Sequence, residues 1–306
     1  MQLVDTHCHI HEADPTIKMD TETRRKYEKA GWPKPDDMIA EAIEAGVSKM
    51  ICVGTTLADS QLAVQFVQTR PNCWASIGIH PHEAKDHLNL NEKKEFEFLL
   101  TTDEGWQAMG QLPPRAHEGA RGRGKWPDRT PTPSKVVAIG ECGLDYYYAD
   151  SPKAEQAELL HFQLQLAEKY NLPVIFHVRD AFDDFWPIFD QYKVRGVIHS
   201  FSATRKELDK ILARDLFVGL NGIMTFTKNE DQLEAAKVVP LENILLETDA
   251  PFLTPDPHRG TICKPKHVSV IAAFLANLRG ESVQELARHS TSNAHKLFGI
   301  ADSNSI

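Results

Sequence analysis

The sequence predicts an α/β fold, a (β/α)8 barrel with an extra C-terminal helix and inserted loops. Short apolar runs alternate with helix-like segments along almost the whole chain, as expected for parallel strands that are buried on both faces. A doubly wound open sheet is the competing architecture, but the even spacing of the strands and the lack of a G-x-G-x-x-G turn favour the barrel. The eight expected strands are residues 3–5, 49–53, 74–79, 136–139, 174–176, 196–198, 216–220 and 244–247.

Helical spacing of apolar residues marks the segments between these strands, and two more helices are expected after the eighth strand. Eight strand–helix units fit the length of 306 residues, so we expect one barrel domain over residues 1–306. The expected helices are residues 36–45, 59–69, 91–101, 151–170, 180–192, 204–214, 230–239, 266–278 and 282–298.

Two stretches interrupt this alternation. Residues 12–35 are charged, contain proline and lie where a barrel carries its active-site loops. Residues 104–134 lack a hydrophobic period and are rich in Gly, Pro and Arg, which predicts an irregular insertion rather than a separate domain. This insertion follows a helix, so we expect it at the end of the barrel away from the active face. Its basic residues could contact nucleic acid, but a solvated surface loop is the simpler interpretation; they are Arg115, Arg121, Arg123, Lys125 and Arg129.

The composition is that of a soluble globular protein, with 42% hydrophobic and 25% charged residues. No apolar run reaches the roughly 18 residues of a membrane span, and no secretory signal precedes the first strand. Five scattered cysteines without a C-x-x-C pair indicate a reducing compartment, so we expect a cytoplasmic protein. We also expect a monomer or a weak oligomer. The net charge of −9 argues against general attraction to nucleic acid, so a polyanionic substrate would need metal ions or a local basic patch.

The first predicted strand ends in a His-x-His pair. His7 and His9 are two positions apart, so in an extended backbone their side chains point to the same side and can approach one point. Imidazole is the commonest metal ligand in proteins. The same alternation turns Cys8 away, and we interpret it as a small core residue rather than a third ligand.

Histidines and carboxylates also follow other strands, at the end where barrel active sites form. Because these strand ends form one ring, their side chains are expected to meet at a common centre. Such ligands, without thiolate, suit Zn2+, Mn2+ or Mg2+, and their number suits two ions bridged by a carboxylate and a water. Glu141, on the fourth strand, is the natural bridge. The expected ligands are His7, His9, Glu141, His177, His199 and Asp249.

Several neighbouring residues are candidates for other roles in the site. The following proline holds His80 in an extended conformation, from which it could face a substrate phosphate. A loop-stabilising role is the alternative for His80 and the favoured one for His82. Asp145 and Arg179 could orient ligands, although Arg179 could instead pair with the adjacent aspartate. Arg259, on the loop after the eighth strand, could bind phosphate, with a structural turn as the alternative.

Six segments, in order and spanning nearly the whole chain, resemble the TatD-like metal-dependent deoxyribonucleases, a branch of the amidohydrolase superfamily. They are DTHCHI (5–10), GIHPH (78–82), AIGECGLDYY (138–147), PVIFHVRDA (173–181), HSFS (199–202) and LLETDAPFLTPDPHRG (245–260). The resemblance implies a TIM barrel with a pair of divalent ions, Mg2+ or Mn2+, with Zn2+ as a further option. It implies one ion on His7, His9, Glu141 and Asp249, and a second on Glu141, His177 and His199.

The resemblance also implies a nuclease that removes nucleotides from the ends of single-stranded or frayed DNA, in the 3′ to 5′ direction. Hydrolysis would use a metal-activated water, with Asp249 as the general base and Glu141 as the second catalytic residue. His80, Arg179 and Arg259 are then the expected substrate contacts.

Three positions depart from the family pattern. The family usually has Asn-Glu-Pro shortly after the HRG turn, where this chain has residues 263–265, Cys-Lys-Pro. Ala203 replaces the usual glycine after HSFS, and Tyr148 stands where a basic residue commonly follows GLDYY. None of these changes removes an expected ligand, so hydrolysis is expected to survive while the choice of substrate could differ.

Two other functions stay open at this point. A metal-dependent barrel hydrolase could cleave a non-DNA ester or amide, such as D-aminoacyl-tRNA or a small molecule. Some of these enzymes bridge their metals with a carboxylated lysine on the fourth strand, and Glu141 in that place favours the nuclease. A non-catalytic protein that binds metal or nucleic acid is the third interpretation, but it would not need so large a ligand set.

Overall fold

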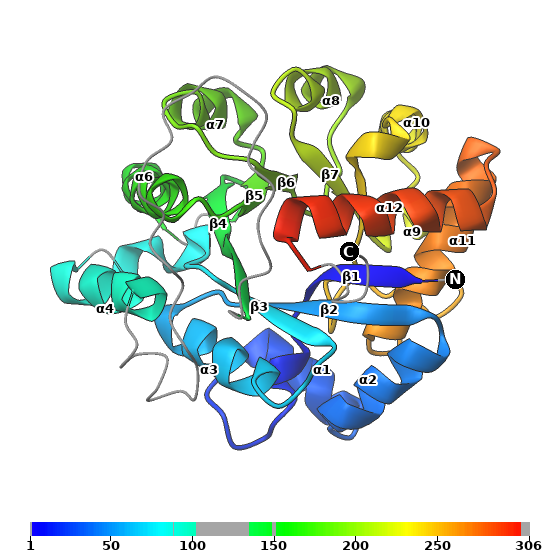
Figure 1. Ribbon diagram of the computed structural model, residues 1–306, viewed down its shortest axis with the longest axis horizontal. Helices are drawn as coiled ribbons and strands as arrows, with labels where there is room; N and C mark the ends of the chain where they lie inside the picture. The colour runs from blue at the N-terminus through cyan, green and yellow to red at the C-terminus, as the bar shows by residue number, and fades with distance from the viewer. Residues whose placement is uncertain (1, 88, 102–134, 149–150, 301–306) are drawn as a thin grey trace.

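The computed structural model describes residues 2–87, 89–101, 135–148 and 151–300 (Figure 1). Eight parallel strands form one sheet in the order β1 to β8, and a bridge between Cys8 and Ala250 brings the first strand back to the chain beyond the last. The predicted (β/α)8 barrel is confirmed. The strands are β1 (Leu3–Cys8), β2 (Val47–Val53), β3 (Cys73–Ile77), β4 (Val136–Asp145), β5 (Val174–Arg179), β6 (Gly196–Ile198), β7 (Phe217–Leu220) and β8 (Ile244–Leu246).

Helices surround the sheet, and α12 lies across one end of the barrel (Figure 1). The longer helices are α1 (Thr21–Lys29), α2 (Pro35–Glu44), α3 (Leu57–Val67), α4 (Leu90–Thr101), α6 (Lys153–Tyr170), α7 (Phe182–Phe189), α8 (Arg205–Leu212), α10 (Glu230–Val238), α11 (Val268–Arg279) and α12 (Val283–Phe298). Short turns are η1 (Ile10–Glu12), η2 (Pro81–Asp86), α9 (Ile223–Phe226), η3 (Leu241–Asn243) and η4 (Pro265–His267). The predicted insertion at 104–134 lies outside the described residues.

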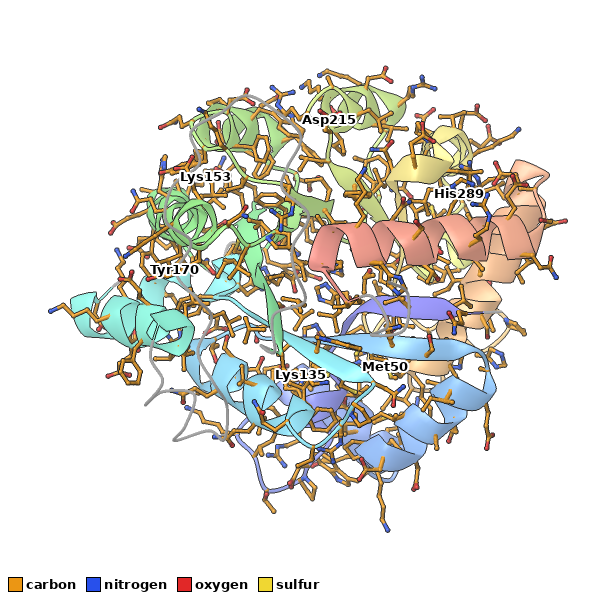
Figure 2. The ribbon with its side chains drawn as sticks, in the orientation of Figure 1. Met50, Lys135, Lys153, Tyr170, Asp215 and His289 are labelled. Atoms are coloured by element: carbon orange, nitrogen blue, oxygen red, sulfur yellow. The ribbon has the colours of Figure 1, made fainter. Side chains whose placement is uncertain are left out.

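Two apolar clusters hold the barrel together. The larger lies between strands and helices and includes Met50, which is fully buried on β2 (Figure 2). The smaller fills the inside of the barrel with side chains such as Val4, Ile51 and Leu245, and Phe298 of α12 packs against them. Burying both faces of the strands explains why they are continuously apolar in sequence. Apolar side chains and α12 thus fill one end of the barrel. The polar residues at the carboxyl ends of the strands line the opposite end.

Shifts in strand register aim the first polar side chains inward. On β1, Leu3 packs in the outer cluster and Val4 in the inner one, so strict alternation would turn His7 outward. The pairing of β1 with β2 shifts between Asp5 and Cys8, and Cys8 then lies in the outer cluster. Cys8 therefore points away from the histidines, as predicted. A bulge of this kind re-aims side chains at barrel rims.

The same device operates on β4. Ile139 and Cys142 both pack in the outer cluster, although they are three positions apart. A register shift against β5 falls between them and leaves Glu141 directed inward. The two strands that carry the His-x-His pair and the predicted bridging carboxylate therefore both depart from regular pairing at the site.

The segment 12–35 is not wholly irregular, because it contains α1. Asp20 begins this helix by accepting hydrogen bonds from the backbone of Glu22 and Thr23 at 2.7 and 3.0 Å. Tyr27 and Thr23 are its buried residues, so the helix lacks the apolar period that predicts helices from sequence. The Tyr27 hydroxyl donates to the carbonyl of His9 at 3.0 Å, which ties α1 to the end of β1.

No helix in the ranges described is both long enough and apolar enough to cross a membrane. All five cysteines are free and buried.

Candidate metal centre

The ends of β1 and β8 bring together two histidines and one carboxylate. His7 Nε2 lies 3.2 Å from His9 Nε2, and Asp249 Oδ1 lies 3.7 and 3.4 Å from these two atoms. His9 Nδ1 is 2.9 Å from the carbonyl oxygen of Val53, to which it donates, so Nε2 faces the cluster. Burial would lower the pKa of His9, but Asp249 and the other carboxylates raise it to about 10, so a bound cation would displace a proton from Nε2. These three side chains could hold one cation.

Glu141 lies between this trio and His177 of β5. Its Oε2 is 3.3 Å from His7 Nε2, and its Oε1 is 2.7 Å from His177 Nδ1. His199, which follows β6, has its Nε2 3.8 Å from Glu141 Oε1 and 4.0 Å from Asp249 Oδ1. The six side chains predicted as ligands thus surround one point, with Glu141 facing both sides of it.

Glu247, to which the sequence assigned no role, supports His199. Its Oε1 lies 2.9 Å from His199 Nδ1 and accepts a hydrogen bond from the Ser200 backbone at 2.6 Å. A Cβ at Gly219 would come within 2.5 Å of the Glu247 carboxylate, so only glycine leaves room for it on β7. Glu247 stands two residues before Asp249, and this spacing is the signal that could have identified it.

Asp145 supports His177 in the same way. Its Oδ2 lies 2.8 Å from His177 Nε2 and 3.0 Å from His82 Nε2. Its Oδ1 accepts hydrogen bonds from the backbone of Tyr147 and Tyr148 at 2.9 and 3.0 Å. A buried carboxylate in this position orients a ligand and raises its basicity, as carboxylates behind metal-bound histidines commonly do.

Asp5 clamps β1 to the end of β8. Its carboxylate accepts from the backbone and hydroxyl of Thr248 at 2.9 and 2.6 Å, and from the backbone of His7 at 3.3 Å. Burial raises the pKa of Asp5 to about 8, against the lowering effect of these bonds. The clamp positions the residue that precedes Asp249, and no local sequence pattern marks Asp5 for this role.

The carboxylates and histidines of this cluster shift each other's pKa values. Burial alone would lower the pKa of His177 and His199, but Asp145, Glu141 and Glu247 outweigh it and raise both pKa values to about 9. Burial would raise the pKa of Glu141, yet the histidines around it hold that pKa well below its usual value. The carboxylate is therefore ionised and attracts cations, whether protons or metal ions.

His7 behaves differently from these two histidines. Its ring stacks on that of His199 with 3.5 Å between centroids, and burial together with His199 lowers the pKa of His7. Two stacked imidazolium ions would repel each other, so His7 is held neutral, the form that binds a metal ion.

His80 is a hydrogen-bond donor toward the cluster. Its Nδ1 accepts from the backbone of His82 at 3.2 Å, which puts the proton of the neutral ring on Nε2, 3.7 Å from Glu141 Oε1. Burial lowers the pKa of His80 well below its usual value, so the ring is neutral. It also belongs to a trio with Glu141 and His177 that could hold a cation.

A further polar trio, His11, Glu12 and Asp59, lies beside His9. His11 Nε2 is 3.0 Å from Asp59 Oδ1, and burial together with the charge of Asp59 raises the pKa of Glu12 to about 8. The geometry would admit a cation, but His11 and Asp59 already pair with each other. His11 lies in η1, beyond the end of β1, and turns away from the six predicted ligands toward α3.

The cluster lies at the floor of a large cavity of about 1400 Å³. Arg179 lines this cavity, with its guanidinium 3.9 Å from the ring centroid of Tyr147. Arg259 is not among the residues that line it. Its guanidinium donates to the Thr254 carbonyl at 2.8 Å and stacks on Phe226 at 3.8 Å, as in the structural turn that was the alternative interpretation.

These donors fit divalent metal ions. Imidazole nitrogens and carboxylate oxygens converge without thiolate, and buried carboxylates behind two of the histidines provide the support that metal ligands need. A barrel with such a cluster at the carboxyl ends of its strands has the arrangement of a metal-dependent hydrolase.

The chain belongs to the TatD-related DNase family, whose model matches residues 4–299. It is 34% identical to the uncharacterized metal-dependent hydrolase YcfH of Escherichia coli K12, over 98% of this chain and 97% of that protein. It is 33% identical to the 3′-5′ ssDNA/RNA exonuclease TatD of Citrobacter rodentium, over 87% of this chain and 92% of that protein. The predicted family is confirmed, and the protein is a metal-dependent hydrolase.

Solved structures agree on the fold. The TatD homolog YJJV of Escherichia coli K12 has a TM-score of 0.75 with 24% identity, and the match covers 98% of each chain. A TatD family hydrolase of Entamoeba histolytica also has a TM-score of 0.75, with 20% identity over 98% of this chain and 99% of that one.

Proposed function

We propose that this protein is a divalent-metal-dependent nuclease that hydrolyses phosphodiester bonds at the ends of single-stranded or frayed DNA, in the 3′ to 5′ direction. The convergence of the six strand-end ligands on Glu141 carries this proposal. The names of the TatD relatives, which describe exonucleases acting on single-stranded DNA and RNA, support it.

The ligand set is proposed as two sites that share Glu141. Its two oxygens face different histidines: Oε2 lies toward His7 and Oε1 toward His177. A carboxylate that bridges two ions would be placed in this way. Zn2+, Mn2+ and Mg2+ all suit these donors, and we favour Mg2+ or Mn2+. The proposed ligands are His7, His9, Glu141 and Asp249 for one ion, and Glu141, His177 and His199 for the other.

When bound, the ions would neutralise the phosphate and lower the pKa of a water toward ~7, as zinc does in known sites. Asp249 is the proposed general base, since its Oδ1 faces the centre of the cluster and its pKa is held below the usual value by His9 and the other histidines despite burial. Glu141 would fix the positions of the two proposed metal sites relative to each other. The neutral His80 would donate a hydrogen bond from Nε2 to a phosphate oxygen and so stabilise the charge that develops there.

Arg179 is the proposed cation for substrate phosphate, because it lines the cavity and no carboxylate among the described residues pairs with its guanidinium. For Arg259, bound to its own loop, a phosphate contact would require the guanidinium to leave Thr254. The protein is proposed to act in the cytoplasm as one barrel domain, monomeric or weakly associated.

A substrate panel tests this function. Purified protein would be incubated with 5′-labelled single-stranded DNA, RNA, D-aminoacyl-tRNA and a chromogenic ester, each with Mg2+, Mn2+ or EDTA. We expect metal-dependent shortening of the DNA from its 3′ end. Cleavage of the aminoacyl-tRNA or the ester alone would instead identify a hydrolase of another ester or amide. Glu141→Gln should remove the activity, and Glu234→Gln, an exposed change on α10, serves as the matched control.

A further inference from the structure

Two adjacent aromatic rings stand exposed at the rim of the cavity. Tyr147 and Tyr148 follow β4, expose 59% and 47% of their surface, and line the cavity above the metal-binding cluster. Large aromatic side chains are normally buried, and their exposure next to a polar cavity indicates a surface for binding. The rings contact each other, His82 and Arg179, and the rest of their surface is open to the cavity.

The backbone that carries the rings is tied to the cluster. Asp145 Oδ1 accepts the backbone N–H groups of both tyrosines, at 2.9 and 3.0 Å. The other oxygen of the same carboxylate lies 2.8 Å from His177 Nε2. One buried side chain therefore positions a proposed metal ligand and the two exposed tyrosines together, so that a group bound on the rings has a defined distance to the reacting phosphate.

Cations accompany the rings. The Arg179 guanidinium lies 3.9 Å from the ring centroid of Tyr147 and 4.9 Å from that of Tyr148. Lys153, at the start of α6 (Figure 2), has its Nζ 3.7 Å from the centroid of Tyr146 and also lines the cavity. A guanidinium stacked on a ring keeps its N–H donors free along its edge, where they can reach a phosphate.

Carboxylates also line the cavity. Asp20 and Glu22 lie at the start of α1, and Asp180, Asp183 and Asp184 follow Arg179 along the chain. A polyanion would be repelled from these carboxylates, so local attraction must come from the cations beside the rings. Alternating rings and cations are the arrangement by which proteins bind single-stranded nucleic acid without reading its sequence.

We propose that Tyr147 and Tyr148, backed by Arg179, form a stacking platform for the unpaired bases beside the scissile phosphate. This inference rests on the proposed nuclease function and names the residues that would hold the unpaired bases of its substrate. Every base has a flat π surface, so the platform accepts all four bases and rejects a strand that lacks them. Paired bases already stack within a duplex and cannot reach the rings.

Kinetics on matched strands test the platform. The substrates are a single-stranded oligonucleotide and the same strand with abasic residues at its 3′ end. Tyr147→Ala with Tyr148→Ala should raise KM for the intact strand by about tenfold, as expected for lost stacking, and should leave kcat nearly unchanged. The abasic strand should have a raised KM with the wild-type protein and respond little to the change. Tyr147→Phe with Tyr148→Phe should restore wild-type behaviour, and Phe98→Ala, which removes an exposed ring on α4, is the control.

Binding without turnover separates this proposal from the proposed function. In EDTA, fluorescence anisotropy should show about tenfold weaker binding of the intact strand to the double alanine variant than to the wild-type protein. Equal affinities, or no binding by either protein, would overturn the platform. A loss of kcat on both strands with KM unchanged would also overturn it, because that pattern reports a displaced His177. Failure of the wild-type protein to cleave any nucleic acid, with the affinity difference present, would reject the nuclease and leave a binding platform.

Discussion

The floor and the rim of the cavity are built in different ways. At the floor, the side chains lie at strand ends, and buried carboxylates support two of the histidines, as Glu247 supports His199. At the rim, exposed side chains such as Tyr147 lie on the loop after β4 and contact other exposed groups. The floor has the rigid, charged character that bond cleavage needs, and the rim has the open, aromatic character that substrate binding needs.

This difference separates chemistry from substrate choice. Changes at the floor should reduce turnover of any substrate, whereas changes at the rim should alter KM for nucleic acid alone. Asp145 is the exception, since it contacts both His177 at the floor and the backbone of the tyrosines at the rim. Substitutions at the floor, at Asp145 and at the rim should therefore reduce activity by different amounts and in different kinetic constants.

Apart from Glu141→Gln, which should remove the activity, Asp249→Asn should cause the largest loss that leaves the fold intact. Amide and carboxylate have the same shape, but the amide cannot accept the proton of the attacking water and binds cations weakly. We expect kcat to fall by roughly 10²–10⁴, the usual contribution of a general base. Single-turnover rates at saturating Mn2+ measure this effect. A rate within twofold of the wild-type value would assign the base to another residue.

Asp145→Asn should have a smaller effect that spans floor and rim. The side chain keeps one acceptor but loses the charge that orients His177, and supporting groups of this kind contribute about 10–100-fold to metal affinity or activity. Titration with Mn2+ and KM for single-stranded DNA should both change. If only KM changed, Asp145 would belong to the rim alone.

The smallest expected effect is the dependence of metal affinity on pH. Carboxylates outweigh burial and raise the pKa values of His177 and His199 to about 9, above the ordinary value of 6.5. Their protonation stabilises the metal-free fold below pH 6.5, and this contribution is lost as the pH rises through about 9. A metal ion must displace these protons, so its affinity should rise over the same interval.

Calorimetry of Mn2+ binding in buffers with different ionisation enthalpies counts the protons released. We expect at least one near neutral pH, and a shift in Tm on adding metal that grows with pH. Release of no proton would show that neither histidine becomes a ligand.

Part of the floor was predictable, because two of the proposed ligands directly follow an apolar run. His177 and His199 each come after a buried strand in regular alternation, so the barrel alone brings them together. The inward turns of His7 and Glu141 depend on register shifts, which no local pattern reveals. Their convergence could be predicted from chemistry but not from strand geometry.

The rest required tertiary contacts. Glu247 and Asp5 act through partners distant in sequence, such as His199 and Thr248. The helix α1 was missed because its nine residues bury little apolar surface. Arg259 was predicted beside the substrate because its loop follows β8, but its guanidinium turns back onto Thr254. Position along the chain predicts where a loop begins, and contacts decide where its side chains point.

The most direct test of the central claim compares the wild-type protein with Glu141→Gln on 5′-labelled single-stranded DNA at saturating Mn2+. Loss of the proposed bridging carboxylate should reduce the activity by more than roughly 100-fold, the upper range for a residue that only supports a ligand. We predict a ladder of products shortened from the 3′ end with the wild-type protein and with Glu234→Gln, and an intact strand with Glu141→Gln. Equal ladders from a folded Glu141→Gln protein would contradict the account.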